Sequence, residues 1–219
     1  MPLPCGKGQD FTNFAFLSVI PMHIPTLTYS FSITKGALFF QEACLIFQHY
    51  TASTIFDTKS KMSFDFLPQN SETSRRSIGQ EIVKRVRSTE WPELWIFFND
   101  LHERDQRLIL FYAICCHYAF VQDFMIEVYH KKWLNMDVDI SKEDIAYFME
   151  LKSASRPEIS DIQDYTKQKI VQVIFRSLQE ANLVSEGKLI DPTFSPQLIH
   201  LFRQNGQVWF LEIIHQNNL

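Results

Sequence analysis

Apolar and polar residues recur along this chain with the period of α-helices. Over residues 36–50 (GALFFQEACLIFQHY) apolar side chains return every three or four positions, as they do on a helix with a buried face. A shorter and weaker helix is predicted over Phe56–Leu67. A turn at Pro68 separates it from a further helix over residues 71–88. The first part of the chain is therefore predicted to hold three helices.

The helical period continues through the rest of the chain. Pro92 stands where a first-turn proline belongs and opens a short helix. Residues 103–134 predict two buried helices, or one long bent helix. Ser141 caps the next helix, and a long amphipathic helix covers residues 162–181. Two short apolar pieces around Ser-Glu-Gly-Lys then predict a β-hairpin, and a small helix over residues 196–205 follows.

These patterns predict an all-α, mainly helical protein with one short C-terminal β-hairpin. Residues 1–28 match no periodic template and contain four prolines, so we expect an irregular N-terminal extension. Residues 29–90 hold the three helices, and a basic third helix behind two shorter ones is the helix-turn-helix pattern. Residues 91–219 form a helical C-terminal part. In this part a long helix is followed directly by a hairpin, which is compatible with a winged-helix-like end.

Composition favours a globular protein outside the membrane. Hydrophobic residues make up 46% of the chain and include 20 Phe, which indicates a core rich in aromatic rings. The longest apolar run, Leu108–Val121, has 14 residues, whereas a membrane-spanning helix needs about 20. The apolar stretch 11–22 lacks the charged start and the cleavage site of a signal peptide. We therefore expect a cytoplasmic protein with no membrane contact.

The sequence lacks the motifs of common enzymes. Its six glycines are too scattered for a phosphate-binding loop, and no hydrolase, deaminase or kinase signature occurs. Cys115, Cys116 and His117 point about 100° apart on a helix, so they do not converge on one ion. Asp161 and Asp164 precede a helix, where carboxylates serve as caps. We expect no enzyme activity, no metal site and no cofactor.

One segment departs from the acidic character of the chain. Residues 71–88 (SETSRRSIGQEIVKRVRS) carry five cations and two carboxylates, a net charge of +3, whereas the whole chain has a formal net charge of -4. At about 100° per residue, Ile78, Ile82 and Val86 fall in one apolar sector. A polar stripe without carboxylates runs beside that sector. Such a face is either a solvated helix surface or the part that meets a partner.

The residue types in this stripe favour nucleic acid. Arg and Lys next to Ser, Thr and Gln are the side chains that contact phosphates and bases. The N-terminal end of a recognition helix presents side chains to base edges in the major groove. We therefore predict that the basic helix binds double-stranded DNA through Thr73, Arg75, Arg76, Gln80, Lys84 and Arg87.

The order of four segments resembles the BrxA family of the BREX bacteriophage-exclusion systems. These segments are YSFSITKGALFFQEA, NSETSRRSIGQEIVKRV, WPELWIFFND and TKQKIVQVIFRSLQEANLV, the last followed by LIDP and the terminal helix. Together they cover about Tyr29 to Asn205, and none is a catalytic signature. The resemblance implies a non-enzymatic DNA-binding protein that acts with other BREX defence proteins. It also implies a NusB-like helical bundle with helix-turn-helix elements.

Two alternative functions stay open at this point. The NusB-like character suggests an RNA-binding adaptor, which competition between duplex DNA and single-stranded RNA would separate from a DNA-binding protein. The other alternative is a protein-interaction scaffold. In that case the basic helix docks an acidic partner, the acidic segment Asp137–Asp144 docks another, and the purified protein does not bind DNA.

Overall fold

The computed structural model describes residues 29–214, so the extension predicted over residues 1–28 lies outside the described part. The described part is mainly helical, and its strands form one two-stranded hairpin, which confirms the all-α prediction. Its first elements, in chain order, are the 3₁₀-helix η1 (Ser32–Lys35), α1 (Phe40–His49), α2 (Ala52–Phe56), α3 (Glu72–Arg87), α4 (Pro92–Ile96), the 3₁₀-helix η2 (Phe98–Asp100) and α5 (Glu103–His117).

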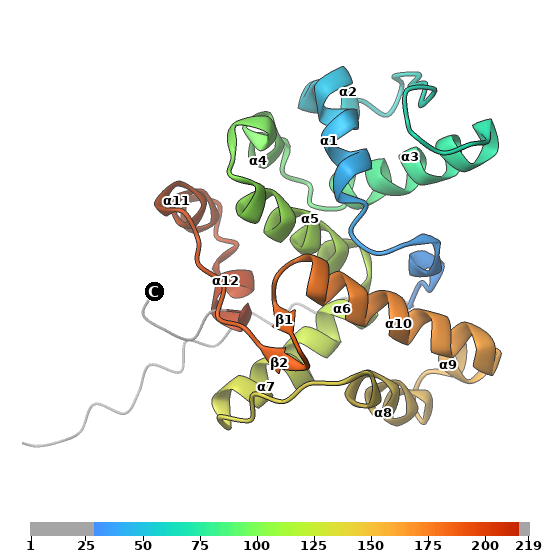
Figure 1. Ribbon diagram of the computed structural model, residues 1–219, viewed down its shortest axis with the longest axis vertical. Coiled ribbons are helices and arrows are strands. Elements are labelled where there is room, and N and C mark those ends of the chain that lie inside the picture. The colour runs from blue at the N-terminus through green and yellow to red at the C-terminus, as the bar shows by residue number, and fades with distance from the viewer. Residues whose placement is uncertain (1–28, 215–219) are drawn as a thin grey trace, which may run out of the picture.

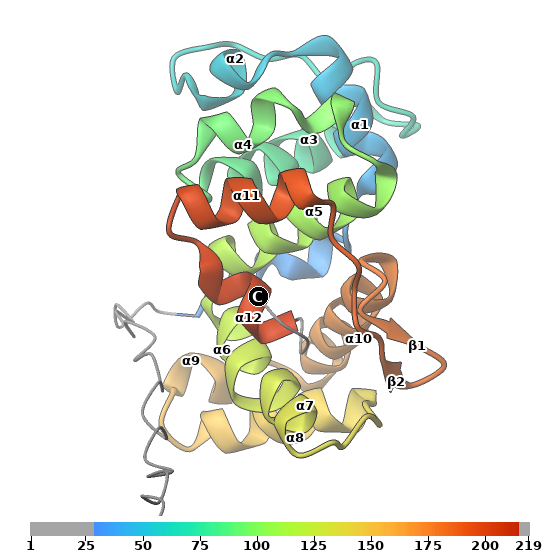
Figure 2. The same cartoon turned by 90° about the vertical axis from the view of Figure 1, so that its left-hand side faces the viewer.

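The second half continues in the same style. Its elements are α6 (Ala119–Phe124), the π-helical turn η3 (Met125–Tyr129), α7 (His130–Leu134), α8 (Lys142–Ser153), α9 (Pro157–Ser160), α10 (Asp164–Glu180), β1 (Val184–Ser185), β2 (Lys188–Leu189), α11 (Pro196–Gln204) and α12 (Val208–Ile214). Figures 1 and 2 show α1, α2 and α3 at one end of the long axis and α8 and α9 at the other.

Local capping signals in the sequence explain where several helices begin. The Ser71 hydroxyl accepts a hydrogen bond from the Ser74 N–H at 3.1 Å and starts α3. Ser141 and Asp144 form a capping box at the start of α8. Pro92 occupies the first turn of α4, as expected.

The helix predicted over Phe56–Leu67 is wrong. The structure has α2 over Ala52–Phe56, and residues 57–71 form a long connection to α3. In this connection the Asp57 carboxylate accepts hydrogen bonds from the Lys59 N–H at 2.9 Å and the Ser60 hydroxyl at 2.8 Å. Such short-range bonds satisfy backbone groups without a helix. The connection is also longer than the three- or four-residue turn of a helix-turn-helix.

Helix α5 forms the centre of the core. Ten of its residues are buried, and it packs against α3, α6 and α10. Tyr112 contacts Phe202 and Phe210 at ring-centroid distances of 5.0 and 5.1 Å, so aromatic rings join α5 to α11 and α12. The core is therefore aromatic, as the composition predicted.

No single helix among residues 29–214 has the length and apolar character to cross a membrane. Helix α5 together with the helix over residues 119–134 meets those criteria only as a pair that bends by 109°. This bend decides between the two predictions for residues 103–134, because it separates two helices at Tyr118.

The predicted hairpin is confirmed. Strands β1 and β2 pair antiparallel, and Glu186 and Gly187 between them have φ angles of 51° and 74°. Two positive φ values are typical of the tight turn that joins hairpin strands. The Leu189 N–H donates to the Val138 carbonyl, and the Ile140 N–H donates to the Gly187 carbonyl, both at 2.8 Å. One edge of the hairpin is therefore bonded to the protein's own backbone.

Candidate nucleic-acid interface

Four of the six predicted DNA-binding residues are exposed on α3. Thr73, Arg76, Gln80 and Lys84 have exposed side chains along one face of the helix. Within residues 29–214, neither Arg76 nor Lys84 forms an ion pair with a carboxylate. Both cations are therefore available to an anionic ligand.

The other two predicted residues make contacts inside the protein. Arg75 is half-buried, and its Nη1 donates to the Gln69 carbonyl at 2.8 Å. Arg87 is also half-buried. Its Nε donates to the Ile55 carbonyl and its Nη2 to the Asp57 carbonyl, the latter at 2.9 Å. These two guanidinium groups therefore bind backbone carbonyls near the two ends of the connection between α2 and α3.

The fifth cation of the basic segment is buried and paired. Arg85 is 3% exposed, and its Nε lies 3.0 Å from the Glu81 carboxylate on the same helix. Its Nη2 donates to the Gly36 carbonyl at 2.9 Å, so the pair also joins α3 to the residues before α1. Glu81 accepts a hydrogen bond from the Tyr118 hydroxyl and lies 3.3 Å from the Lys35 ammonium.

This buried cluster keeps Glu81 ionised. Burial by itself would raise the pKa of Glu81, but the charge of Arg85 and the hydrogen bonds from Tyr118, Arg85 and Lys35 hold it below its ordinary value. Burial also raises the pKa of Tyr118, to about 12. The cluster holds η1, α3 and the start of α6 together, and its α3 cation, Arg85, is buried where a ligand cannot reach it.

A loop that the sequence analysis overlooked lies along α3. We call residues 57–66 the basic loop after its exposed cations Lys59 and Lys61; Asp57 and Asp65, also exposed, bring its formal net charge to zero. Its tip is held by Tyr50, whose hydroxyl both donates to the Ser63 carbonyl and accepts from the Ser63 N–H, each at 2.9 Å. These two lysines were missed because a helix was predicted there.

The basic loop is packed directly against the backbone of α3. The Phe64 ring is 6% exposed and lies over Gly79, where a Cβ atom would come within 2.2 Å of the ring. Phe66 stacks on His49 with ring centroids 3.8 Å apart. Gly79 therefore has a steric role, because it lets the loop approach the helix closely.

A groove of about 690 Å³ runs between the basic loop and α3. Five cations line it, Lys61 from the loop and four from the helix, together with the carboxylates of Asp65 and Glu72. The groove is therefore net positive in a chain that is net negative. The helix residues that line it include five of the six predicted ones: Arg75, Arg76, Gln80, Lys84 and Arg87.

Cys115, Cys116 and His117, which were considered as a metal or nucleophile site, are packed inside the fold. Cys115 is buried, and burial raises its pKa well above the ordinary thiol value; the pKa of Cys116 rises to about 12 for the same reason. His117 Nδ1 lies 2.7 Å from the Ser88 hydroxyl, and burial lowers its pKa. Within residues 29–214 no three His, Cys, Asp or Glu side chains gather as metal ligands.

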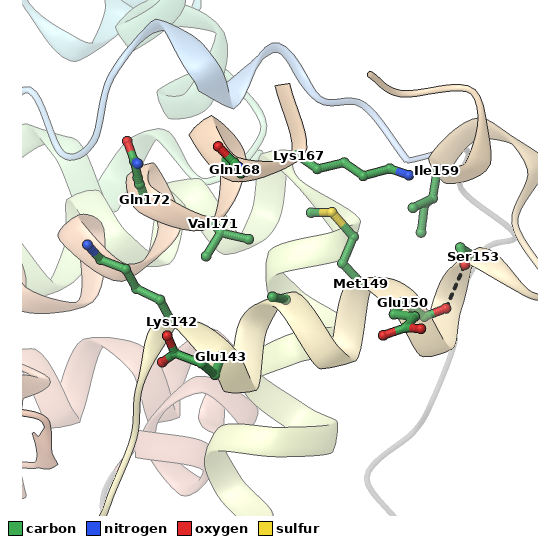
Figure 3. A pocket seen from close by; sticks show the side chains of 11 residues that line it. Lys142, Glu143, Met149, Glu150, Ser153, Ile159, Lys167, Gln168, Val171 and Gln172 are labelled. Carbon is green, nitrogen blue, oxygen red and sulfur yellow. Dashed lines mark hydrogen bonds between the residues drawn. The ribbon is translucent and has the colours of Figure 1, made fainter. Parts of the chain in front are cut away.

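A second groove, between α8 and α10, differs in its chemistry (Figure 3). It has a volume of about 530 Å³, and Met149, Ile159 and Val171 form its apolar part. The charged residues that line it are two cations and two anions: Lys142, Glu143, Glu150 and Lys167. This balance of charge does not favour a polyanion.

The acidic segment considered for docking is partly neutralised. Asp137 and Asp144 both lie near the Lys132 ammonium, at 2.9 and 3.1 Å. Since one lysine pairs with both carboxylates, the segment offers a basic partner less charge than its sequence indicates.

The fold has a counterpart among solved structures. The crystal structure of an uncharacterized protein from Magnetospirillum magneticum superposes with a TM-score of 0.70 at 20% sequence identity. The similarity covers 86% of this chain and 99% of that chain, and at this identity it concerns the fold alone. The comparison with curated proteins gives no match.

The family comparison covers the whole candidate interface. The BrxA family model matches residues 27–206, a range that includes α3 and the basic loop. It agrees in extent with the four segments whose order resembles that family. Because the match extends over most of the sequence, the chain belongs to the BrxA family.

Proposed function

We propose that this protein is a non-enzymatic, DNA-binding accessory protein of a BREX-type bacteriophage-defence system. Its BrxA membership associates it with BREX. The observation that carries the DNA-binding part is the pair of exposed cations on α3, Arg76 and Lys84, which line one groove with Lys61 and have no carboxylate partner in the described residues. In this proposal the protein acts in the cytoplasm, on double-stranded DNA and with the other BREX proteins as its partners.

Electrostatics supports a local DNA site on this chain. The formal net charge of -4 repels a polyanion at long range, so binding requires a surface where cations outnumber carboxylates. The groove beside α3 has that excess, whereas the α8–α10 groove does not. Cations that neutralise phosphates release counterions, so the affinity should fall steeply as salt rises.

The direct test measures binding of the purified protein to a labelled DNA duplex over a series of salt concentrations. The Arg76→Ala/Lys84→Ala variant should bind more weakly, and its slope of log affinity against log salt should shrink by roughly two, because each phosphate contact contributes about 0.9. Both side chains are exposed, so circular dichroism should show an unchanged fold.

A matched control removes the same charge elsewhere. Lys131 on α7 and Lys169 on α10 are exposed, lie outside the groove and form no ion pair with the described residues. Lys131→Ala/Lys169→Ala should leave the salt slope nearly unchanged. Equal losses in the two variants would mean that DNA attraction is spread over the surface, and the assignment to α3 would then be wrong.

Two outcomes of the same assay would favour the alternative functions. If single-stranded RNA displaces the duplex at equal nucleotide concentration, the protein is an RNA-binding adaptor. If the wild-type protein binds neither nucleic acid, the positive groove is complementary to an acidic protein surface, and the scaffold function replaces the proposed one.

A further inference from the structure

We propose that the groove between α3 and the basic loop binds the sugar-phosphate backbone of DNA, and that α3 does not enter the major groove to read bases. This inference rests on the proposed function and specifies its contacts. It assigns a binding role to the basic loop, through Lys61 and the neighbouring Lys59.

The first argument is steric. The major groove is about 12 Å wide, and an α-helix with its side chains has a diameter of about 10–12 Å, so a recognition helix enters it alone. Here residues from Glu72 to Arg87 line the groove together with Ser60 to Asp65. The loop therefore lies beside α3 along the helix. The helix and the loop together are wider than a major groove and cannot enter it as a unit.

The second argument is the placement of charge on both sides of the groove. Lys61 comes from the loop, and Arg76 and Lys84 come from the helix, so a chain of phosphates between them would meet cations from two directions. The hydroxyls of Ser60 and Ser63 donate to the carboxylates of Asp57 and Asp65, at 2.8 and 2.6 Å. Lysine ammonium groups are then the loop side chains suited to phosphates.

The third argument is that the loop is held in place by specific contacts. Phe64 packs on Gly79, and Arg87 donates hydrogen bonds to the carbonyl of Ile55 in α2 and to that of Asp57 at the start of the loop. Arg87 is therefore a positioning residue, although the sequence analysis predicted it as a DNA contact. Gly79 carries no charge and has the same effect through shape alone.

The Gly79→Ala variant tests the shape of the groove without removing any of its charges. It retains every cation, and alanine favours a helix more than glycine does. The added Cβ would lie 2.2 Å from Phe64 Cδ1, so the ring and the basic loop must move. We expect DNA affinity to fall several-fold and the salt slope to shrink by about one, the contribution of Lys61. The matched control on the same helix is Ser74→Ala, an exposed position that lines neither the loop groove nor the hollow beside Arg76 and should bind as wild type.

Lys61→Ala tests the loop without disturbing the packing. Lys61 is exposed, so the fold should persist, and the slope should again shrink by about one. Combining it with Gly79→Ala should give no further loss of slope, because both changes remove the same contact. If Gly79→Ala does not fold, as judged by circular dichroism, Lys61→Ala decides the question by itself.

Sequence preference gives an independent readout. A protein that binds the phosphate backbone should bind a duplex and its shuffled version with affinities equal within about twofold, whereas base contacts discriminate by about 1–3 kcal/mol, or roughly fivefold to 150-fold, for each good pair. A tenfold or larger preference for one sequence would overturn the inference.

The remaining outcomes distinguish the inference from the function on which it rests. If Arg76→Ala/Lys84→Ala loses affinity while Lys61→Ala and Gly79→Ala bind as wild type, the loop is not part of the site and the proposed function stands. If the wild-type protein does not bind DNA, the proposed function itself fails.

Discussion

The two faces of α3 use the same kinds of side chain for opposite purposes. On the outer face, Arg76 and Lys84 are exposed and have no ion-pair partner in the described residues. On the inner face, Arg85 is buried with Glu81, and its guanidinium also bonds to backbone carbonyls before α1. One face leaves its cations open to solvent, and the other joins three parts of the fold.

This difference shows that the charge of a segment overstates what a ligand can meet. Residues 71–88 are basic because they contain five cations. Yet Arg85 forms an ion pair with Glu81, and Arg87 donates hydrogen bonds to backbone carbonyls. The free cations of the interface are fewer, and Lys61 adds one from outside the segment. Burial and partners, not residue type, decide which charges a ligand can reach.

The largest expected effect is on the inner face. Glu81→Ala leaves Arg85 buried without its carboxylate, which should lower the free energy of unfolding by about 3–5 kcal/mol. Urea unfolding followed by circular dichroism measures this change. The control Glu72→Ala removes an exposed carboxylate from the same helix and should cost less than about 0.5 kcal/mol. Similar losses in both variants would show that the two faces do not differ in this way.

The pH dependence of stability should have the same origin. The folded pKa of Glu81 lies below its ordinary value of 4.5, mainly because the charge of Arg85 opposes the effect of burial. An acid with a lowered folded pKa stabilises the protein above its unfolded pKa, and that stabilisation is lost as pH falls through the folded pKa. The melting temperature should therefore decrease as the pH is lowered from about 4.5.

Glu81→Gln isolates this contribution. Other carboxylates, such as Asp57 and Glu158, also have lowered pKa values, so the wild-type protein loses stability in acid for several reasons. The glutamine variant should be less stable at neutral pH, and its stability should depend less on pH below 4.5 than that of the wild type. Parallel pH curves for the two proteins would contradict the assignment to Glu81.

A smaller effect on stability is expected for Arg87, which lies between the outer and inner faces of α3. Arg87→Ala removes hydrogen bonds to the Ile55 and Asp57 carbonyls and should cost about 1 kcal/mol of stability, since the site is partly solvated. The Ser60 N–H, which donates to the Asp57 carbonyl at 3.3 Å, should exchange with deuterium faster. Lys84→Ala is the control for loss of charge, and unchanged exchange in Arg87→Ala would mean that Arg87 does not hold the loop.

The smallest effect on stability should come from the outer face. Arg76→Ala and Lys84→Ala should each change the free energy of unfolding by less than about 0.5 kcal/mol, because both side chains are exposed and unpaired within the described residues. Thermal melts of the single variants measure this. A loss above 1 kcal/mol in either would show that the outer face also stabilises the fold.

Much of the helical framework could be predicted because its signals are local. The cap at Ser71, the capping box at Ser141, the proline that opens α4 and the hairpin turn at Glu186 and Gly187 all depend on residues a few positions apart. The exposed positions Arg76, Gln80 and Lys84 were predicted equally well, because the apolar sector of α3 faces the core. The helix predicted over 56–67 failed because hydrogen bonds made by Asp57 compete with the helical backbone.

By itself, the sequence determined the fold class, the family and the outer stripe of α3, since periodicity and charge spacing are properties of neighbouring residues. Only the tertiary structure decided which cations are free. Arg85 is buried through contacts with residues almost fifty positions earlier, and Lys61 lines the groove beside α3 because Phe64 packs over Gly79. Long-range packing sets the burial and partners of each charge, and no local pattern contains that information.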